Sequence, residues 1–503
     1  KYFGSAEIVT SGLHNRMFGS GDPLGYNTRV FGFDQFGYNL FEAMLSGPLW
    51  MKKDSAGNKT RPILGFFASF NVTDELDPRP FIGGSWRLKE EFRDQILANP
   101  LRPTSTGQGV YHNSNFLRAN AFENTPFRNN AGRTVYSGTF KIDANVGPNV
   151  SLSFGGQVAY NTGNQFNYFN SLMNWENFGI STRLDTRFFG RFTHRLRFDD
   201  REGSSSKISS FFYSLMLDYS NSVGSTQDRN HRDNLFNYGY VGRFSTQRRP
   251  TYEFVDGVDE FGNSFQYFEH NGFEDVSTSF VPSDVNASFA SITSQYYNIY
   301  QNDPSMTASL QDIVNGNALR NGDRPQNVYG IWENVGVPFG IYSKFQQEQY
   351  RATGSATMNI GGHSVSMGFE FEQRVDRGYS AAPIRIWEVA RQLANSHIRE
   401  LDTDRPTWDN VGTFSRVTYE RLNAGNGFQN GFFGGFDDPQ SFFDYNLRNL
   451  LGLNPFGNDF INLDEVDPSS LHFGMFSPDE LFNSGGRELG HGGLPFVNYF
   501  GYD

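Results

Sequence analysis

The chain has no cysteine and no long hydrophobic run. None of its 503 residues is cysteine, which excludes disulfide frameworks, cysteine-based zinc sites and thiol catalysis. No segment approaches the ~18 consecutive apolar residues that a membrane-spanning helix needs, although this does not exclude spanning strands. Basic residues are also scarce, with 42 Lys and Arg against 54 Asp and Glu, and a formal net charge of −12. This acidic balance argues against nucleic acid as a partner.

Aromatic residues and glycine are abundant instead. The chain holds 52 Phe, 24 Tyr and 54 Gly, a mixture that favours strands and turns over helical bundles. It is too long for one ordinary soluble domain, so we expect either several domains or one very large β structure. The sequence opens at Lys1 in a strand-like segment, and we interpret it as a piece of a longer protein.

The most informative segment runs from Ser181 to Phe198. Its odd positions carry five arginines and an aspartate, whereas its even positions are mostly Phe and Leu. Successive side chains of a strand point to opposite faces, so this segment has one charged and one apolar face. A transmembrane β-strand has this pattern when one face meets lipid and the other a watery lumen. The alternative is one long exposed strand of a soluble β-sandwich.

The same alternation recurs in nine long segments. They are residues 1–10, 37–50, 63–73, 133–146, 150–161, 181–198, 209–220, 350–360 and 363–376. Their connections alternate between short and long; the longest are about 74–132 and 221–349, and 221–349 is read as non-alternating. Antiparallel outer-membrane barrels have short periplasmic turns and longer extracellular loops. We therefore predict an all-β fold, an antiparallel transmembrane β-barrel over residues 1–377, and an extracellular loop region over 378–503.

Other local patterns fall between these strands. Leu88, Phe92 and Ile96 recur every four residues and predict a short helix, and apolar residues at helical spacing predict another from Arg385 to Leu401. The tract from Lys52 to Arg61 (KKDSAGNKTR) reads as a charged turn. Such short helices fit within long loops.

Four stretches resemble one family. KYFGSAEIVTS, GYNLFEAMLSGPLW, the hairpin into GFEFEQRVDRGYS and RQLANSHIREL, taken in this order, resemble TonB-dependent outer-membrane receptors of Bacteroidota, of the SusC-like and carboxypeptidase-regulatory-domain types. The resemblance covers most of the chain, and none of the four stretches is a catalytic signature.

The resemblance implies a location, partners and missing parts. It implies the bacterial outer membrane, a barrel of about 22 strands and a periplasmic plug that contacts TonB. The plug and the C-terminal strands have no counterpart here, so the resemblance implies about nine strands of that barrel. The expected partners are membrane lipid, TonB through the missing plug, and a surface lipoprotein lid or other outer-membrane proteins.

Two groups of residues are candidates for ligand contact. Charged side chains expected to line the lumen are Arg183, Asp185, Arg187, Arg191, Glu370, Glu372, Arg374 and Asp376. The alternative is that they line the wall and pair with one another or with the plug. Loop aromatics that can stack on a ligand are Tyr297, Tyr300, Tyr329 and Trp332. The alternative for these is packing of the loop itself. We assign no catalytic, cofactor or metal-binding residue.

Three functions compete at this stage. The first is energised nutrient import through a plugged barrel, which is not an enzymatic activity. The second is a structural barrel that scaffolds an outer-membrane complex through its loops. The third is a secreted β-rich protein that binds or hydrolyses carbohydrate; it requires paired acids in a cleft. The sequence does not name the transported ligand, because one fold serves many ligands.

Overall fold

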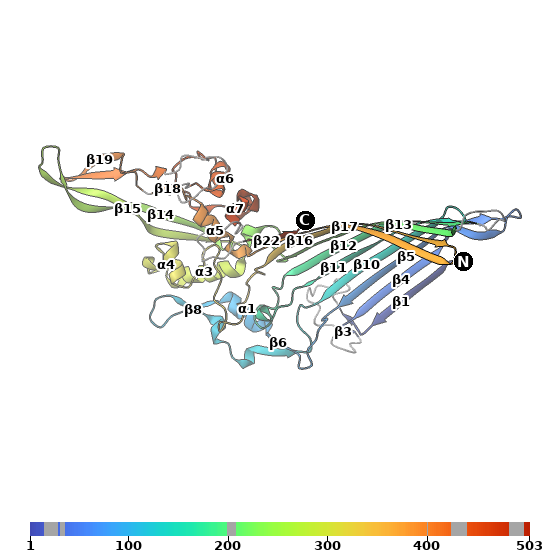
Figure 1. Cartoon of the computed structure of the whole chain (residues 1–503). Coiled ribbons are helices and arrows are strands. Elements are labelled where there is room, and N and C mark those ends of the chain that lie inside the picture. Colours follow the sequence, from blue (N-terminus) through green and yellow to red (C-terminus); the bar gives the residue numbers. More distant parts are fainter. Residues whose placement is uncertain are drawn as a thin grey trace.

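The computed structural model describes residues 1–14, 29–30, 36–198, 208–399, 401–423, 440–481 and 497–502. Its largest element is a ten-stranded sheet in which all neighbours are antiparallel (Figure 1). Its strands, in spatial order, are β1 (Phe3–Thr10), β4 (Asn39–Lys53), β5 (Lys59–Glu75), β10 (Arg133–Asn145), β11 (Val150–Asn164), β12 (Ile180–Arg197), β13 (Ile208–Gln227), β16 (Tyr342–Ile360), β17 (His363–Ala381) and β22 (Val497–Tyr502). Among the described residues the sheet is open, with β1 and β22 at its edges.

The nine predicted alternating segments are confirmed as strands of this one sheet. Most are longer than predicted; β13, for example, continues to Gln227 and β16 begins at Tyr342. The tenth strand, β22, was missed, because VNYFGY is short and contains glycine. It pairs only with Asp376–Ala381 of β17, so the edge of β17 from His363 to Val375 has no strand beside it among the described residues.

The connections at the two ends of the sheet differ in length. Short turns join β4 to β5, β10 to β11 and β16 to β17 at one end. At the other end the chain makes long excursions, and Figure 1 shows these gathered into a separate body beyond the strand ends. The predicted alternation of short and long connections is therefore present in the structure.

The long connections contain the helices and the small sheets. The helices are α1 (Glu90–Ala98), α2 (Tyr168–Ser171), α3 (Ala287–Ile299), α4 (Leu310–Asn315), α5 (Ile386–Leu393), α6 (Phe442–Leu450) and α7 (Pro478–Leu481). The paired strands are β2 (Leu13–His14) with β3 (Arg29–Val30), β6 (Ser85–Leu88) with β9 (Phe122–Thr125), β7 (Leu101–Pro103) with β8 (Val110–His112), and β18 (Ile398–Arg399) with β21 (Leu422–Asn423). Among the described residues no helix has the length and apolar character needed to cross a membrane.

A four-stranded arm corrects the prediction for residues 221–349. That segment was read as non-alternating, but it contains a long hairpin of β14 (Gly242–Val258) and β15 (Ser264–Pro282). β20 (Phe414–Tyr419) and β19 (Pro406–Val411) extend this hairpin into a separate sheet, which projects away from the ten-stranded sheet in Figure 1. Register shifts at Gln247/Arg248 and Thr251/Tyr252 interrupt the alternation, which explains why the pattern was not recognised.

Both predicted helices are present, but their bounds differ from the predicted ones. α1 contains Phe92 and Ile96, but Leu88 belongs to β6. The helix expected from Arg385 to Leu401 ends at Leu393, because Asn395 adopts a left-handed φ of 62° and the chain then enters β18.

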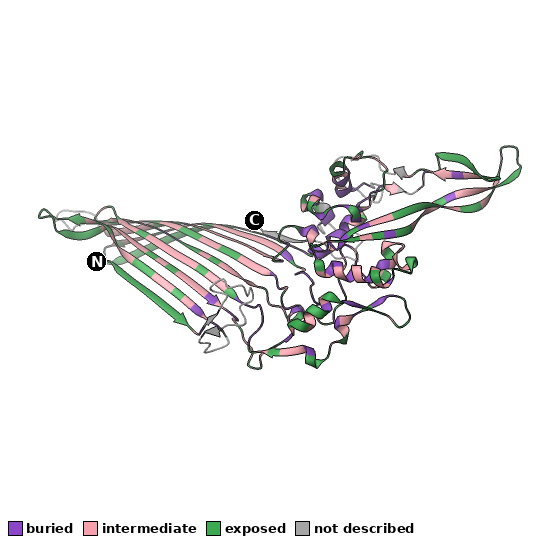
Figure 2. Ribbon diagram, turned by 180° about the vertical axis from the view of Figure 1, so that it is seen from behind, coloured by how far each residue is buried: buried purple, intermediate pink, exposed green. Residues whose placement is uncertain are grey.

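The hydrophobic core lies in the connections and not against the sheet. Figure 2 shows buried residues concentrated in the body beyond the strands, while the sheet itself is largely intermediate or exposed. The indole of Trp387 donates a hydrogen bond to the Phe236 carbonyl, and Phe236 stacks on Phe443 and Phe476. Connections before and after residue 377 contribute to the same buried cluster.

Candidate functional site: the polar face of the sheet

Polar side chains form rows across one face of the ten-stranded sheet. Directly opposed residues of antiparallel strands share a face. One row runs through Arg187, Ser220, Gln349 and Arg374 on four successive strands. The next row, toward the long connections, places Asp185, Ser222, Gln347 and Asp376 side by side. Two of the predicted charged segments, on β12 and β17, are thus brought to one surface although they are far apart in sequence.

Ion pairs hold most of the predicted charges in place. Arg183 Nε lies 2.8 Å from Asp185 Oδ1, and Arg374 Nε lies 2.9 Å from Asp376 Oδ2. Glu370 lies 3.5 Å from Arg351 of the neighbouring strand. These contacts agree with the alternative in which the charges line the wall and pair with one another.

The most buried of these pairs joins β12 to β13. A terminal nitrogen of Arg187 lies 2.7 Å from Asp218 Oδ2, and Arg187 Nε donates a second hydrogen bond to the same oxygen. The side chain of Asp218 is only 6% exposed, whereas that of Arg187 is 49% exposed. The guanidinium therefore covers the carboxylate and keeps its own far side open to the solvent.

Two predicted residues are less constrained. The guanidinium of Arg191 contacts the Met216 sulfur at 3.4 Å and makes no carboxylate pair among the described residues. Glu372 lies opposite Arg351 in the register and is exposed. These two side chains can turn toward a ligand at lower cost than the paired charges.

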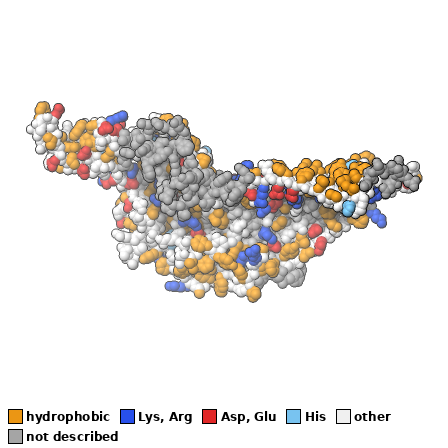
Figure 3. Space-filling model, in the orientation of Figure 1, with side chains coloured by type: hydrophobic (Ala, Val, Ile, Leu, Met, Phe, Trp, Pro, Cys, Tyr) orange, Lys and Arg blue, Asp and Glu red, His pale blue; other side chains and the backbone are white. Residues whose placement is uncertain are grey.

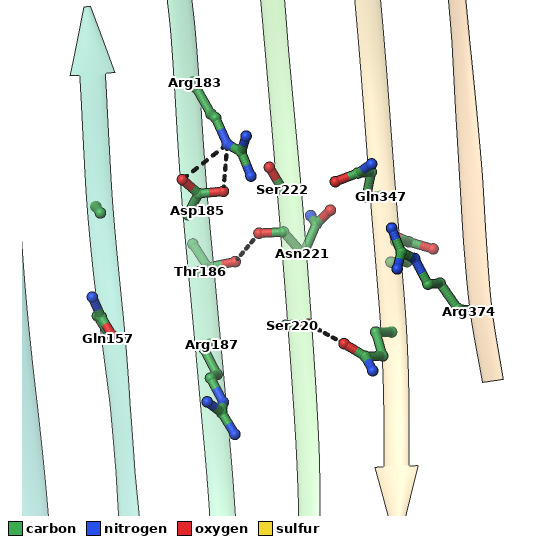
Figure 4. A pocket seen from close by; sticks show the side chains of 13 residues that line it. Gln157, Arg183, Asp185, Thr186, Arg187, Ser220, Asn221, Ser222, Gln347 and Arg374 are labelled. Carbon is green, nitrogen blue, oxygen red and sulfur yellow. Dashed lines mark hydrogen bonds and ion pairs between the residues drawn. The ribbon is translucent and has the colours of Figure 1, made fainter. Parts of the chain in front are cut away.

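A cavity of about 340 Å³ lies on this face. Its side chains come from the five neighbouring strands β11, β12, β13, β16 and β17, and Figure 4 shows Arg183 and Asp185 on one side with Gln347 and Arg374 on the other. Ser222 Oγ lines the cavity and is buried without a hydrogen-bond partner among the described residues, and so is Asp376 Oδ1 in the same row. A polar cavity with cations, amides and unsatisfied oxygens is suited to hydroxyl-rich or peptide-like groups and to water.

The two carboxylates of the cavity have partners. Asp185 pairs with Arg183, and Glu348 Oε1 accepts a hydrogen bond from the side-chain amide of Gln346 at 3.0 Å. Among the described residues no three His, Asp or Glu side chains gather closely enough to hold a metal ion. The chemistry available on this face is binding through hydrogen bonds and charge.

The opposite face of the sheet is apolar and exposed. Large hydrophobic side chains on it include Leu152, Phe154, Leu215, Leu217, Met367, Phe369 and Phe371, with exposures from 42% to 66%. Figure 3 shows hydrophobic side chains gathered over the strands, with charged groups alongside. Soluble proteins rarely expose contiguous apolar patches beyond a few hundred Å², so this face requires an apolar surrounding.

The four predicted loop aromatics differ in how deeply they are buried. Tyr300 is 7% exposed and donates a hydrogen bond to the Gly109 carbonyl at 2.6 Å. Tyr297 packs on the core and donates to the Thr278 carbonyl at 2.6 Å. Burial raises the pKa of both phenols. Their rings and hydroxyls pack the loop body, which agrees with the alternative given for these residues.

The other two aromatics lie together near the hairpin-like bridge between Val328 and Trp332. Trp332 is partly buried against the second, smaller core. Tyr329 is 57% exposed and has a left-handed φ of 53°. Of the four predicted loop aromatics, Tyr329 is the one that presents a ring to solvent.

Sequence reasoning missed the uncharged members of the polar face. Gln157, Ser220, Ser222, Gln347 and Gln349 line the cavity together with the arginines. The alternation of these polar residues within β11, β13 and β16 can be recognised in the sequence. Whether they lie side by side in the sheet depends on the register between the strands. Asp218 was also missed as the partner of Arg187.

A second cluster that was missed lies on the projecting arm. Tyr267 and Trp408 have ring centroids 5.3 Å apart, and Phe265 lies beside both. Trp408 is 51% exposed. Phe265 and Trp408 are exposed, and the strands that carry the three rings, β15 and β19, belong to the arm that projects away from the ten-stranded sheet in Figure 1.

Comparison of the chain with protein-family models, with curated proteins and with solved structures returns no match.

Proposed function

We propose that this chain forms part of the wall of a transmembrane β-barrel in a bacterial outer membrane. The observation that carries the proposal is the ten-stranded antiparallel sheet with a polar face and an exposed apolar face. Lipid on the apolar face and water on the polar face satisfy both surfaces at once. The short turns at one end and the long connections at the other also favour this interpretation.

The barrel is completed by further strands in this proposal. A sheet edge in lipid leaves backbone groups without hydrogen bonds, at several kcal/mol each. The edges of β1 and of His363–Val375 in β17 therefore have to pair with strands outside the ten described here. The resemblance of the sequence to TonB-dependent receptors supplies the expected total of about 22 strands.

The function we propose is energised nutrient import. The polar cavity around Arg187 and Gln347 then faces the lumen, where a plug gates the passage and contacts TonB. The body of long connections lies on the extracellular side and captures the ligand, with a surface lipoprotein lid as a candidate partner. No catalytic step is involved.

The projecting arm favours a second function, that of a scaffold. Its exposed aromatic residues, among them Trp408, can bind a protein partner without any ligand passing through the barrel. In that case the loops hold other outer-membrane proteins in a complex.

Extraction of the native protein in mild detergent, followed by mass spectrometry of the purified particle, tests both functions. Import predicts peptides of a plug and of a lipoprotein lid in the particle. A stable set of other outer-membrane proteins, present irrespective of ligand, favours the scaffold. Recovery of the protein from the soluble fraction without detergent contradicts the barrel itself.

A further inference from the structure

The turn between β4 and β5 carries four cations in two opposed pairs. Lys52 lies opposite Arg61 in the register, and Lys53 lies opposite Lys59. All four are exposed, and none forms an ion pair with a carboxylate of the described residues. Like charges placed directly across a strand pair destabilise it, so this turn gains stability from any anion that binds beside it.

The one carboxylate within the turn is already used. Asp54 Oδ1 accepts hydrogen bonds from the backbone N–H of Ala56 at 3.0 Å and of Asn58 at 2.8 Å. Asp54 Oδ2 accepts from the side-chain amide of Asn58 at 3.4 Å. These bonds, together with Gly57 at a φ of 82°, fix the turn. Asp54 therefore shapes the hairpin and does not neutralise its cations.

Two exposed aromatic residues, Tyr2 and Trp50, lie on the apolar face toward the same end of the sheet as this turn. Trp50 is 65% exposed and lies opposite Leu64. Tyr2 is also 65% exposed, and its ring covers Gly47, where a Cβ would come within 2.3 Å of the Tyr2 ring. Trp and Tyr side chains concentrate where the hydrocarbon of a membrane meets its headgroups.

We infer that this turn, defined as Lys52–Arg61, binds the phosphate-bearing headgroups of anionic phospholipids at the short-turn surface of the membrane. The inference rests on the proposed membrane location. Trp50 marks the headgroup level, and the cations lie immediately beyond it in the chain. Long lysine and arginine side chains can extend from the end of an apolar surface to reach phosphates. Each such residue near an anionic surface strengthens binding.

The chain supplies its own reporter for this contact. It contains six tryptophans, and Trp50 is the one on the ten-stranded sheet, since Trp86, Trp175, Trp332, Trp387 and Trp408 all lie in the long connections or the arm. Bromine on a lipid chain quenches the fluorescence of a tryptophan that it touches. The difference between the full chain and a Trp50→Phe variant isolates the Trp50 signal.

The experiment places the complete barrel that contains this chain in vesicles of phosphatidylcholine with a minor fraction of brominated phosphatidylglycerol. Anionic lipid collects around the turn, so quenching of Trp50 exceeds that of random mixing by about twofold or more. High salt reduces the excess, because salt screens exposed charges. The comparison sample holds the same fraction of brominated phosphatidylcholine, which gives the random value.

Two variants complete the test. Replacing all four cations with glutamine lowers quenching to the random value, whereas the charge-preserving set Lys52→Arg, Lys53→Arg, Lys59→Arg and Arg61→Lys retains the excess. Equal quenching by the two brominated lipids in the unaltered chain overturns the lipid inference while leaving membrane insertion intact. Absence of quenching by either lipid contradicts insertion, and with it the proposed function.

Discussion

Arg187 of β12 and Asp218 of β13 form an ion pair at 2.7 Å in which the arginine covers a carboxylate that is 6% exposed. Each residue belongs to a different strand, so the pair fixes the two strands in one register. The pair also shows how charged side chains are arranged on the polar face. The carboxylate is buried beneath a cation whose outer side remains available to solvent or to a ligand.

This pair is expected to matter for stability. Asp218→Asn removes the negative charge and leaves Arg187 unpaired, which lowers the free energy of unfolding by about 1 kcal/mol, since the exposed arginine is partly screened by water. Thermal unfolding in detergent measures the change. The control is Arg191→Gln, whose guanidinium has no carboxylate pair among the described residues; it is expected to change stability by less than about 0.5 kcal/mol. Equal effects of the two variants would contradict this assignment.

The two faces of β13 are expected to tolerate charge differently. Leu217→Arg places a cation on the apolar face and costs about 2–4 kcal/mol at the middle of a bilayer. Ser214→Arg places the same residue on the polar face, where it lies opposite the uncharged Thr193 and Ser355, and is tolerated. The fraction of folded protein in isolated membranes is the measurement. A similar loss for both variants would argue that the sheet is covered by protein on both sides.

Packing on the apolar face depends on a glycine. The Phe369 ring of β17 lies over Gly354 of β16, where a Cβ would approach ring atom Cε1 within 2.1 Å. Gly354→Val is expected to displace the ring and to lower stability by about 1–3 kcal/mol. Gly190→Ala is the matched control, because a Cβ there meets nothing within 4 Å. Thermal unfolding measures the stability of both variants. Destabilisation by Gly190→Ala together with no effect of Gly354→Val would contradict this packing.

The loop body is expected to lose stability in mild acid because of His397. This imidazole is 1% exposed; burial lowers its pKa below the ordinary value of 6.5, with Arg448 acting in the same direction and Asp444, 3.3 Å away, opposing it. The unfolded chain therefore binds a proton at His397 before the folded chain does. The stability contributed by the neutral ring is complete above pH 6.5 and falls as the pH drops through the lowered pKa.

The measurement for this prediction is the unfolding midpoint of the loop body between neutral pH and pH about 5. His397→Gln is expected to flatten the pH dependence over that range. His472→Gln, at an exposed position, is expected to leave the dependence unchanged. A steeper slope in His397→Gln would show that another group controls the transition.

Strands were more predictable from the sequence than their surroundings. Alternation in a segment such as 181–198 is a local property, so all nine long strands could be found without knowing their neighbours. β22 was missed because six residues carry too little pattern. The β14–β15 hairpin was missed because its bulges, as at Thr251/Tyr252, break the period of two.

The candidate site was predictable only in part. The charged residues of β12 and β17 could be assigned to the polar face simply because they occupy every second position of each strand. Their neighbours across the sheet, such as Asp218 and Gln347, depend on register, which a single strand does not encode. The choice between ligand contact and packing for Tyr300 depends on the tertiary packing of α3 against residues near Gly109, which sets the exposure of this ring. Composition carries no information on that contact.

The absence of cysteine allows the central claim to be tested directly. Single cysteines introduced one at a time along β13, at positions 214, 215, 216 and 217, can be labelled in native membranes with a water-soluble maleimide. Ser214→Cys and Met216→Cys face the polar side and are expected to label, whereas Leu215→Cys and Leu217→Cys face lipid and are expected to remain protected until detergent is added. Uniform labelling of all four positions in intact membranes would contradict the account of this sheet as a membrane wall.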